Sequence, residues 1–165
     1  MITTPTDKRA TVGYTVPNDD ALAEQTIAIN RISRTVKGGR RIRFRALVVV
    51  GNRHGRVGLA MEKGNDVQSA IAKAKRRAEK SAIDINLIDG TIAHEVCVTY
   101  GTTKVLLKPA KQGHSIIAGG AVRAVCELAG VRNIVSKTLG SSNALNAAMA
   151  TMLALQSVGV KTKKS

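Results

Sequence analysis

A dense run of basic side chains between residues 31 and 56 is the strongest chemical signal in the sequence. Nine Lys or Arg residues fall within these 26 positions, and no Asp or Glu is among them. Such side chains bind phosphate groups, and a dense cluster of them indicates a polyanionic partner. The alternative is an ordinary solvated sheet face, and the lack of any compensating acid argues against it. The nine are Arg31, Arg34, Lys37, Arg40, Arg41, Arg43, Arg45, Arg53 and Arg56.

The spacing inside this run predicts a ladder of arginines on a strand. Residues 41–46 alternate charged and apolar side chains, which is typical of a strand with one buried face. Arg41, Arg43 and Arg45 would then project together from the other face at intervals of roughly 7 Å, a spacing suited to successive phosphates. The KGGR sequence at 37–40 predicts a turn at the start of this strand.

The composition favours structured RNA as the polyanion. The net charge is +15, and the hydrophobic content of 44% is ordinary for a packed globular protein. The only aromatic residues are Tyr14, Phe44 and Tyr100. Because proteins that read single-stranded bases usually stack them on aromatic rings, we expect recognition of phosphates, sugars and shape instead. No apolar run is long enough to span a bilayer and the first residues lack a signal-peptide core, so a cytoplasmic location is expected.

The apolar periodicity predicts an α+β protein with two small domains. Residues 1–21 lack periodicity and are expected to form a mobile tail. The first domain, 22–88, would hold a three-stranded antiparallel sheet (25–36, 40–50 and 56–61), followed by one helix with Asn65 as its N-cap. A bulge is expected near Arg31, where the apolar phase slips. His54, in the hairpin loop after the second strand, is either an RNA contact or a simple loop residue.

The second domain is predicted to cover residues 89–156, after a turn at Asp89-Gly90. Strands are expected at 92–99, 103–109 and 133–139. One helix would end at Leu128 with Gly130 as its stop, and another would be capped by Ser141 or Ser142. Residues 157–165 would form a basic tail.

Residues suited to catalysis or metal binding are scarce. The loop at 112–120 is the segment most similar to an enzyme loop, but it has neither the Lys-Ser/Thr pair of a P-loop nor the dinucleotide fingerprint. We expect it simply to pack tightly against the helix that follows. Cys97 and Cys126 are expected to be buried without forming a disulfide. They share no metal-ligand spacing with the histidines, so no catalytic residue, metal or cofactor is expected.

Four sequence blocks, taken together, resemble the bacterial small-subunit ribosomal protein five family. They occur in the family's order over about four fifths of the chain. The blocks are NRISRTVKGGR at 30–40, GRVG at 55–58, IIAGG and then RAV at 116–125, and AGV at 129–131.

The resemblance implies a fold and a function. The first domain would be double-stranded-RNA-binding-like, and the second a βαβ-type domain with a left-handed crossover. The protein would be a non-enzymatic constituent of the small ribosomal subunit, bound to ribosomal RNA between head and body, near the channel through which messenger RNA enters. It would touch ribosomal proteins four and eight and help decoding accuracy.

The family's functional positions transfer onto two places in this sequence. Ser33, Arg34, Lys37 and Gly38, with Gly39, would form a tip that reaches toward RNA of the head. Ser115 and Arg123 would face ribosomal protein four, although His114-Ser115 replaces the Thr-Gly usual in the family. The candidate RNA-binding residues are therefore Arg31, Ser33, Arg34, Lys37, Gly38, Gly39, Arg40, Arg41, Arg43, Arg45, Arg53, His54 and Arg56. The candidate protein-interface residues are His114, Ser115 and Arg123.

Two other functions remain open at this point. A free-standing structured-RNA-binding protein or RNA chaperone would use the same basic surface. A small nucleotide-binding phosphotransferase is the other alternative, because several kinases share the implied second fold and a fold alone does not determine function.

Overall fold

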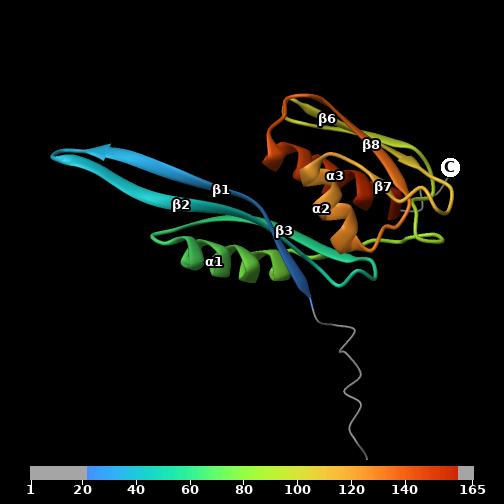
Figure 1. The fold of residues 1–165 in the computed structure, drawn as a ribbon, viewed down its shortest axis with the longest axis horizontal. Helices are drawn as coiled ribbons and strands as arrows, with labels where there is room; N and C mark the ends of the chain where they lie inside the picture. The colour runs from blue at the N-terminus through green and yellow to red at the C-terminus, as the bar shows by residue number, and fades with distance from the viewer. Residues whose placement is uncertain (1–21, 160–165) are drawn as a thin grey trace, which may run out of the picture.

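The computed structural model describes residues 22–159, which form two α+β units (Figure 1). The tail expected at 1–21 lies outside the described residues, as does the part of the tail expected at 157–165 that follows Gly159. In the first unit, four strands pair antiparallel in the order β1-β2-β3-β4. The predicted sheet-plus-helix is confirmed, and the sequence missed only its two-residue fourth strand. The elements are β1 (Ala23–Val36), β2 (Gly39–Gly51), β3 (Arg56–Gly64), α1 (Val67–Lys80) and β4 (Ile83–Asp84).

The second unit is a mixed four-stranded sheet with two helices. Its strand order is β5-β6-β8-β7, and β7 runs parallel to β8 with α2 between them in the chain. This is the βαβ arrangement that the resemblance implied; the left-handed sense of its crossover stays a prediction. The helix α3 ends at Gly159, inside the segment predicted as a basic tail. The elements are β5 (Val96–Tyr100), β6 (Thr103–Pro109), β7 (Ile116–Ile117), α2 (Gly120–Ala129), β8 (Ile134–Gly140) and α3 (Ala144–Gly159).

Buried side chains cover both faces of β2. On the α1 side, small residues let the helix lie close to the sheet: Ala46, Val48, Val50, Ala70, Ala74 and Ala78. On the other side, Leu47 and Val49 belong to a larger cluster that contains Leu107 of the second sheet and buried residues of α2 and α3. Figure 1 shows α1 on one side of the first sheet and the second unit on the other. The two units therefore share one hydrophobic core, and the domain boundary near residue 89 stays a prediction.

Two local predictions in the first unit need correction. The register shift in β1 lies between Thr26 and Ala28, whereas pairing with β2 is continuous through Arg31. The cap of α1 is Asp66, whose N–H donates to the Ser69 hydroxyl at 3.2 Å. The predicted cap was Asn65, which also suits such a site but lies one residue too early.

The start of α3 and two predicted packing environments also differ. Asn143 precedes α3 and its Oδ1 accepts from the Leu145 N–H at 3.1 Å, so neither predicted serine is the cap. Cys97 is exposed on β5 because it alternates with half-buried neighbours, whereas Cys126 is buried as predicted. In the loop before α2, a methyl group at Gly113 would meet no atom within 4 Å, so the loop is not tightly packed at that glycine. Among residues 22–159, no helix is both long and apolar enough to cross a membrane.

Candidate nucleic-acid interface

The β1–β2 hairpin extends beyond the rest of the first sheet as a two-stranded arm (Figure 1). Pairing of β2 with β3 begins at Phe44, so residues 39–43 pair with β1 alone. At the tip, Gly38 and Gly39 have φ angles of +91° and +151°, which side chains rarely adopt. The predicted KGGR turn is confirmed. The buried face predicted beside the arginines is not found at the outer end, since Ile42 is 43% exposed where no third strand covers it.

One face of the first sheet, along the arm and at its base, carries five cations, which we call the arginine face: Arg34, Arg41, Arg43, Arg45 and Lys63. Arg41, Arg43 and Arg45 alternate along β2 and share this face, as predicted. The pairing register sets Arg34 directly opposite Arg41, and Lys63 directly opposite Arg45. Like charges in directly opposed positions destabilise a sheet, so this arrangement favours a bound anion over the free protein.

The arginine face has no internal counter-charge. No Asp or Glu of residues 22–159 comes within 4 Å of its charged groups. The α1 side of the same sheet differs, because Glu24 pairs with Lys75 at 2.9 Å and Glu62 pairs with Arg77. The Glu24 carboxylate raises the pKa of Lys75 through a hydrogen bond and its charge. The charge of the arginine face is therefore left to be neutralised from outside.

The outer cations border a groove of about 390 Å³ with an apolar floor. Ile32 and Val36 of β1 supply the floor, and Arg34, Arg41, Arg43 and Lys63 are the charged residues that line it. A groove with cations around apolar side chains suits a nucleic-acid backbone whose sugars rest on the floor and whose phosphates meet the rim.

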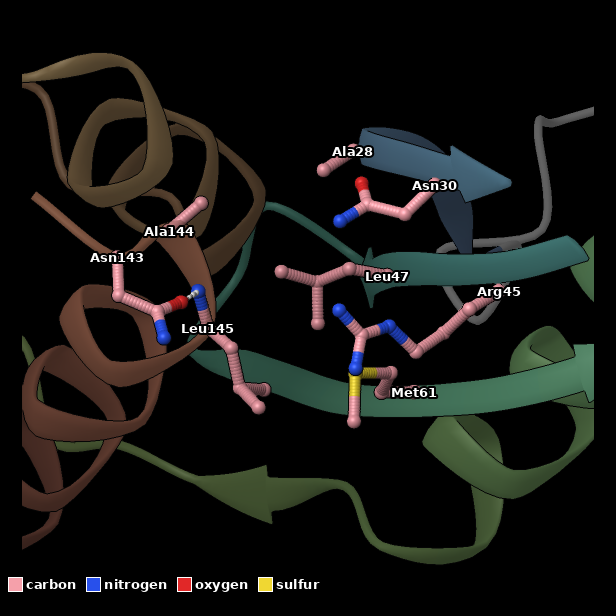
Figure 2. A pocket seen from close by; sticks show the side chains of 8 residues that line it. All are labelled: Ala28, Asn30, Arg45, Leu47, Met61, Asn143, Ala144 and Leu145. Atoms are coloured by element: carbon pink, nitrogen blue, oxygen red, sulfur yellow. Dashed lines mark hydrogen bonds between the residues drawn. The ribbon is translucent and has the colours of Figure 1, made fainter. Parts of the chain in front are cut away.

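Arg45, the innermost cation, lies at the junction between the two units. It is half-buried and lines a pocket of about 150 Å³ that reaches the start of α3. Figure 2 shows its side chain extending into this pocket between Leu47 and Met61. When the Asn30 amide is oriented to satisfy both of its polar atoms, its oxygen accepts from Nη2 of Arg45 at 3.3 Å. Arg45 therefore packs as well as carrying charge, unlike the freely exposed Arg41 and Arg43.

The remaining candidate RNA contacts do not join the arginine face. Ser33 lines the groove but lies opposite Ile42, so its side chain belongs to the α1 side of the sheet. Arg31, opposite Phe44, and Arg40 project from the same side. Lys37, Gly38 and Gly39 form the tip. Arg53, His54 and Arg56 follow the other end of β2, which thirteen strand residues place roughly 40 Å away.

The loop carrying Arg53 and His54 caps helix α2 of the second unit. The Arg53 N–H donates to the Leu128 carbonyl and the Gly55 N–H to the Ala129 carbonyl, each at 2.9 Å. These bonds satisfy carbonyls that a helix C-terminus otherwise leaves unpaired. The helix ends at Gly130, whose φ of +89° confirms the predicted stop. The Arg53 and His54 side chains remain exposed, while the backbone of Arg53 and Gly55 holds the two units together.

The candidate protein-interface residues lie at the exposed rim of the second unit. His114 and Ser115 are in a loop before β7 that is held by the buried Asn133 side chain. Its Oδ1 accepts from the N–H groups of Gly113 and Ser115 at 3.1 and 3.2 Å. Arg123 is exposed one turn into α2, beyond β7. All three residues are exposed and so are available to a partner.

Lys63 is the member of the arginine face that sequence reasoning missed. The predicted third strand stopped at Met61, whereas β3 continues to Gly64. Met61 and Lys63 alternate along β3 in phase with Leu47 and Arg45 of β2. This alternation could have predicted that Lys63 faces the same side as Arg45, although the consecutive charged residues Glu62 and Lys63 obscure the pattern.

Two family models match the chain and together cover well over half of its 165 residues. The model described as ribosomal protein S5, N-terminal domain, matches residues 22–86. The model described as ribosomal protein S5, C-terminal domain, matches residues 98–161. The two matches correspond to the two structural units in chain order. The chain therefore belongs to the ribosomal protein S5 family, whose members are structural, rRNA-binding proteins of the small ribosomal subunit.

Proposed function

We propose that this ribosomal protein anchors rRNA on the arginine face and engages a second rRNA element through the Lys37–Gly39 tip. The observation that carries the proposal is the pair of directly opposed like charges, Arg34–Arg41 and Lys63–Arg45, with no carboxylate of the described residues beside them. The free protein bears this repulsion, and phosphates relieve it.

The finer role follows from where the two contacts lie on the arm. A protein that binds one RNA element with its strands and another with its tip fixes the angle between the two elements once both are bound. We propose that the elements belong to the head and body of the small subunit, near the channel through which messenger RNA enters, and that the contact supports decoding accuracy. His114, Ser115 and Arg123 would meet ribosomal protein four, and ribosomal protein eight would be a second neighbour, on cytoplasmic ribosomes.

The salt dependence of rRNA binding tests the anchoring role. The triple variant Arg34→Gln, Arg41→Gln, Arg43→Gln spares Arg45, which also packs at the junction. The slope of log K against log salt is negative, and each lost phosphate contact reduces its magnitude by about 0.7–0.9. The triple variant should therefore reduce the magnitude by about 2–3. A control that replaces the exposed Lys104, Lys111 and Lys137 by Gln removes the same charge from the second unit and should leave the slope unchanged. An unchanged slope in the arm variant would overturn the proposal.

The role of the tip is tested separately in cells. Lys37→Glu reverses the charge of the tip without altering the glycines that form the turn. Stop-codon readthrough should change while sucrose gradients still show the protein on small subunits. Normal readthrough with normal subunit levels would remove the decoding role and leave the anchoring role intact.

A further inference from the structure

A second basic surface lies on α1, away from the arginine face. Lys73, Arg76, Arg77 and Lys80, which we call the helix stripe, recur at the spacing i, i+3, i+4, i+7 and are all exposed. Residues at this spacing share one side of a helix, and seven residues span roughly 10 Å along its axis. The stripe borders a groove of about 310 Å³ beside Glu62 of β3.

The helix stripe and the arginine face lie on opposite sides of the first sheet. Helix α1 packs through Ala70, Ala74 and Ala78 against the side of β2 that carries Ala46 and Val48. The arginine face belongs to the alternate residues of β2, which point to the other side. Figure 1 shows α1 separated from the second unit by this sheet. One straight RNA segment cannot lie along both surfaces.

The stripe is not explained by the needs of the helix itself. Only Arg77 and Lys80 lie in the last turn, where a cation interacts favourably with the helix dipole. Neighbours such as Lys73 and Arg77, or Arg76 and Lys80, are like charges four residues apart, which destabilise a helix. Of the four residues only Arg77 has a carboxylate of the described chain within 4 Å, that of Glu62. The charge of Lys73, Arg76 and Lys80 is left unpaired by residues 22–159.

The chemistry of the surface favours a phosphate backbone over an acidic protein. Protein–protein interfaces have an apolar core, usually with aromatic or large aliphatic side chains. The large exposed hydrophobic residues of the described chain all lie outside α1: Ile29, Ile42, Ile88, Tyr100, Ile117, Leu139 and Leu153. Phosphate contacts need only well-placed cations. We propose that the helix stripe binds the phosphates of a second RNA segment, so that the first unit is held between two RNA segments; this rests on the proposed rRNA binding.

A matched pair of single substitutions on α1 tests the stripe. Lys73→Gln should lower the salt slope of rRNA binding by about 0.7–0.9, the value for one phosphate contact. Lys75→Gln removes the same charge two residues away, where the side chain pairs with Glu24, and should leave the slope unchanged. The triple variant Lys73→Gln, Arg76→Gln, Lys80→Gln should lower the slope by about 2–3. If Lys73→Gln and Lys75→Gln change the salt slope equally, the change reflects net charge alone and not a phosphate contact of the stripe, and the inference is overturned.

Comparison with the arm separates this inference from the proposed function. If the arm triple variant lowers the slope and the stripe triple variant does not, the inference fails and the proposed function stands. If neither lowers it, both fail. If the two surfaces contact different phosphates, the combined variant should show the sum of the two decreases.

Directed cleavage of RNA tests whether the segments differ. An iron chelate is tethered to Ala72→Cys beside the stripe, or to Ile42→Cys on the arm, each with Cys97→Ser and in reconstituted small subunits. The remaining thiol, Cys126, is buried, and burial raises its pKa to about 12, so it stays unlabelled. We expect two separate sets of cleaved nucleotides. Cleavage of the same nucleotides from both positions, or none from position 72, would overturn the second segment.

Discussion

The contact between the β2–β3 loop and the end of α2 should make Gly51 indispensable for stability. A methyl group at Gly51 would overlap the carbonyl of Leu128 and lie 2.9 Å from the carbonyl oxygen of Arg56. Both neighbours are backbone atoms, so no side-chain rotation relieves the overlap. Gly51→Ala must therefore move the loop away from the helix, and the bonds from Arg53 and Gly55 to α2 are lost.

The magnitude follows from those two bonds and the remaining strain. A buried backbone hydrogen bond contributes about 1 kcal/mol, and overpacking adds about 1 kcal/mol or more, so the free energy of unfolding should fall by about 3 kcal/mol. Urea unfolding followed by far-ultraviolet circular dichroism measures this change. The wild type should unfold in one transition, because the units share a core.

Gly120→Ala is the matched control for this measurement. It is the same substitution in the first turn of α2, where the added methyl group meets nothing within 4 Å. Because Ala is the better helix former, the control should be as stable as the wild type or gain up to about 1 kcal/mol. If Gly51→Ala matched the control within 0.5 kcal/mol, a value on the order of ordinary surface substitutions, the close approach of loop and helix would be refuted.

Three further outcomes are expected. The arm variant Arg34→Gln, Arg41→Gln, Arg43→Gln should be more stable than the wild type without RNA, by up to about 1 kcal/mol, because it removes opposed like charges; lower stability in urea would count against the repulsion. Asn133→Ala should cost about 2 kcal/mol and speed amide exchange at Gly113 and Ser115, which both donate to its side chain; unchanged exchange would contradict its role. Burial raises the Cys126 pKa from 9.0 to about 12, so the unfolded state loses this proton first and stability should fall by about 1.4 kcal/mol per pH unit above pH 9. Cys126→Ala should remove the fall in stability between pH 9 and 10. This range lies below the one in which Lys75, with its raised pKa, loses its pairing with Glu24. If the fall persists in Cys126→Ala, another group causes it.

The arginine pattern shows what a sequence can and cannot predict here. Alternation placed Arg41, Arg43 and Arg45 on one face because side-chain direction along a strand is a local property. Whether the other face is covered depends on how far β3 extends, which no pattern inside β2 records. Ile42 was therefore predicted buried and is exposed, and Lys63 was missed. The strand β7 has two residues, too few for any periodicity, although it makes the second sheet mixed.

The joining of the two units was only partly visible in the sequence. The run from Leu47 to Val50 has no polar alternation, which is typical of a strand buried on both faces. The side of this run opposite α1 is covered in the structure, where Leu47 and Val49 belong to the shared core. The covering element is α2 of the second unit, attached through backbone bonds from a loop predicted to contact RNA. Backbone donors carry no side-chain signature, so the capping role of Arg53 and Gly55 could not be predicted.

The arm is anchored to the rest of the protein at its inner end. A two-stranded ribbon has no core of its own, and the arm beyond Phe44 has pairing with β1 as its sheet contact. Segments with few buried contacts open at low free energy, so the outer arm should exchange its amides faster than the rest of β2. The inner end is fixed by Arg45 at the junction and by Leu47 in the shared core. If RNA neutralises the arginine face as proposed, the repulsion between the opposed cations is removed and amide exchange in the outer arm should slow.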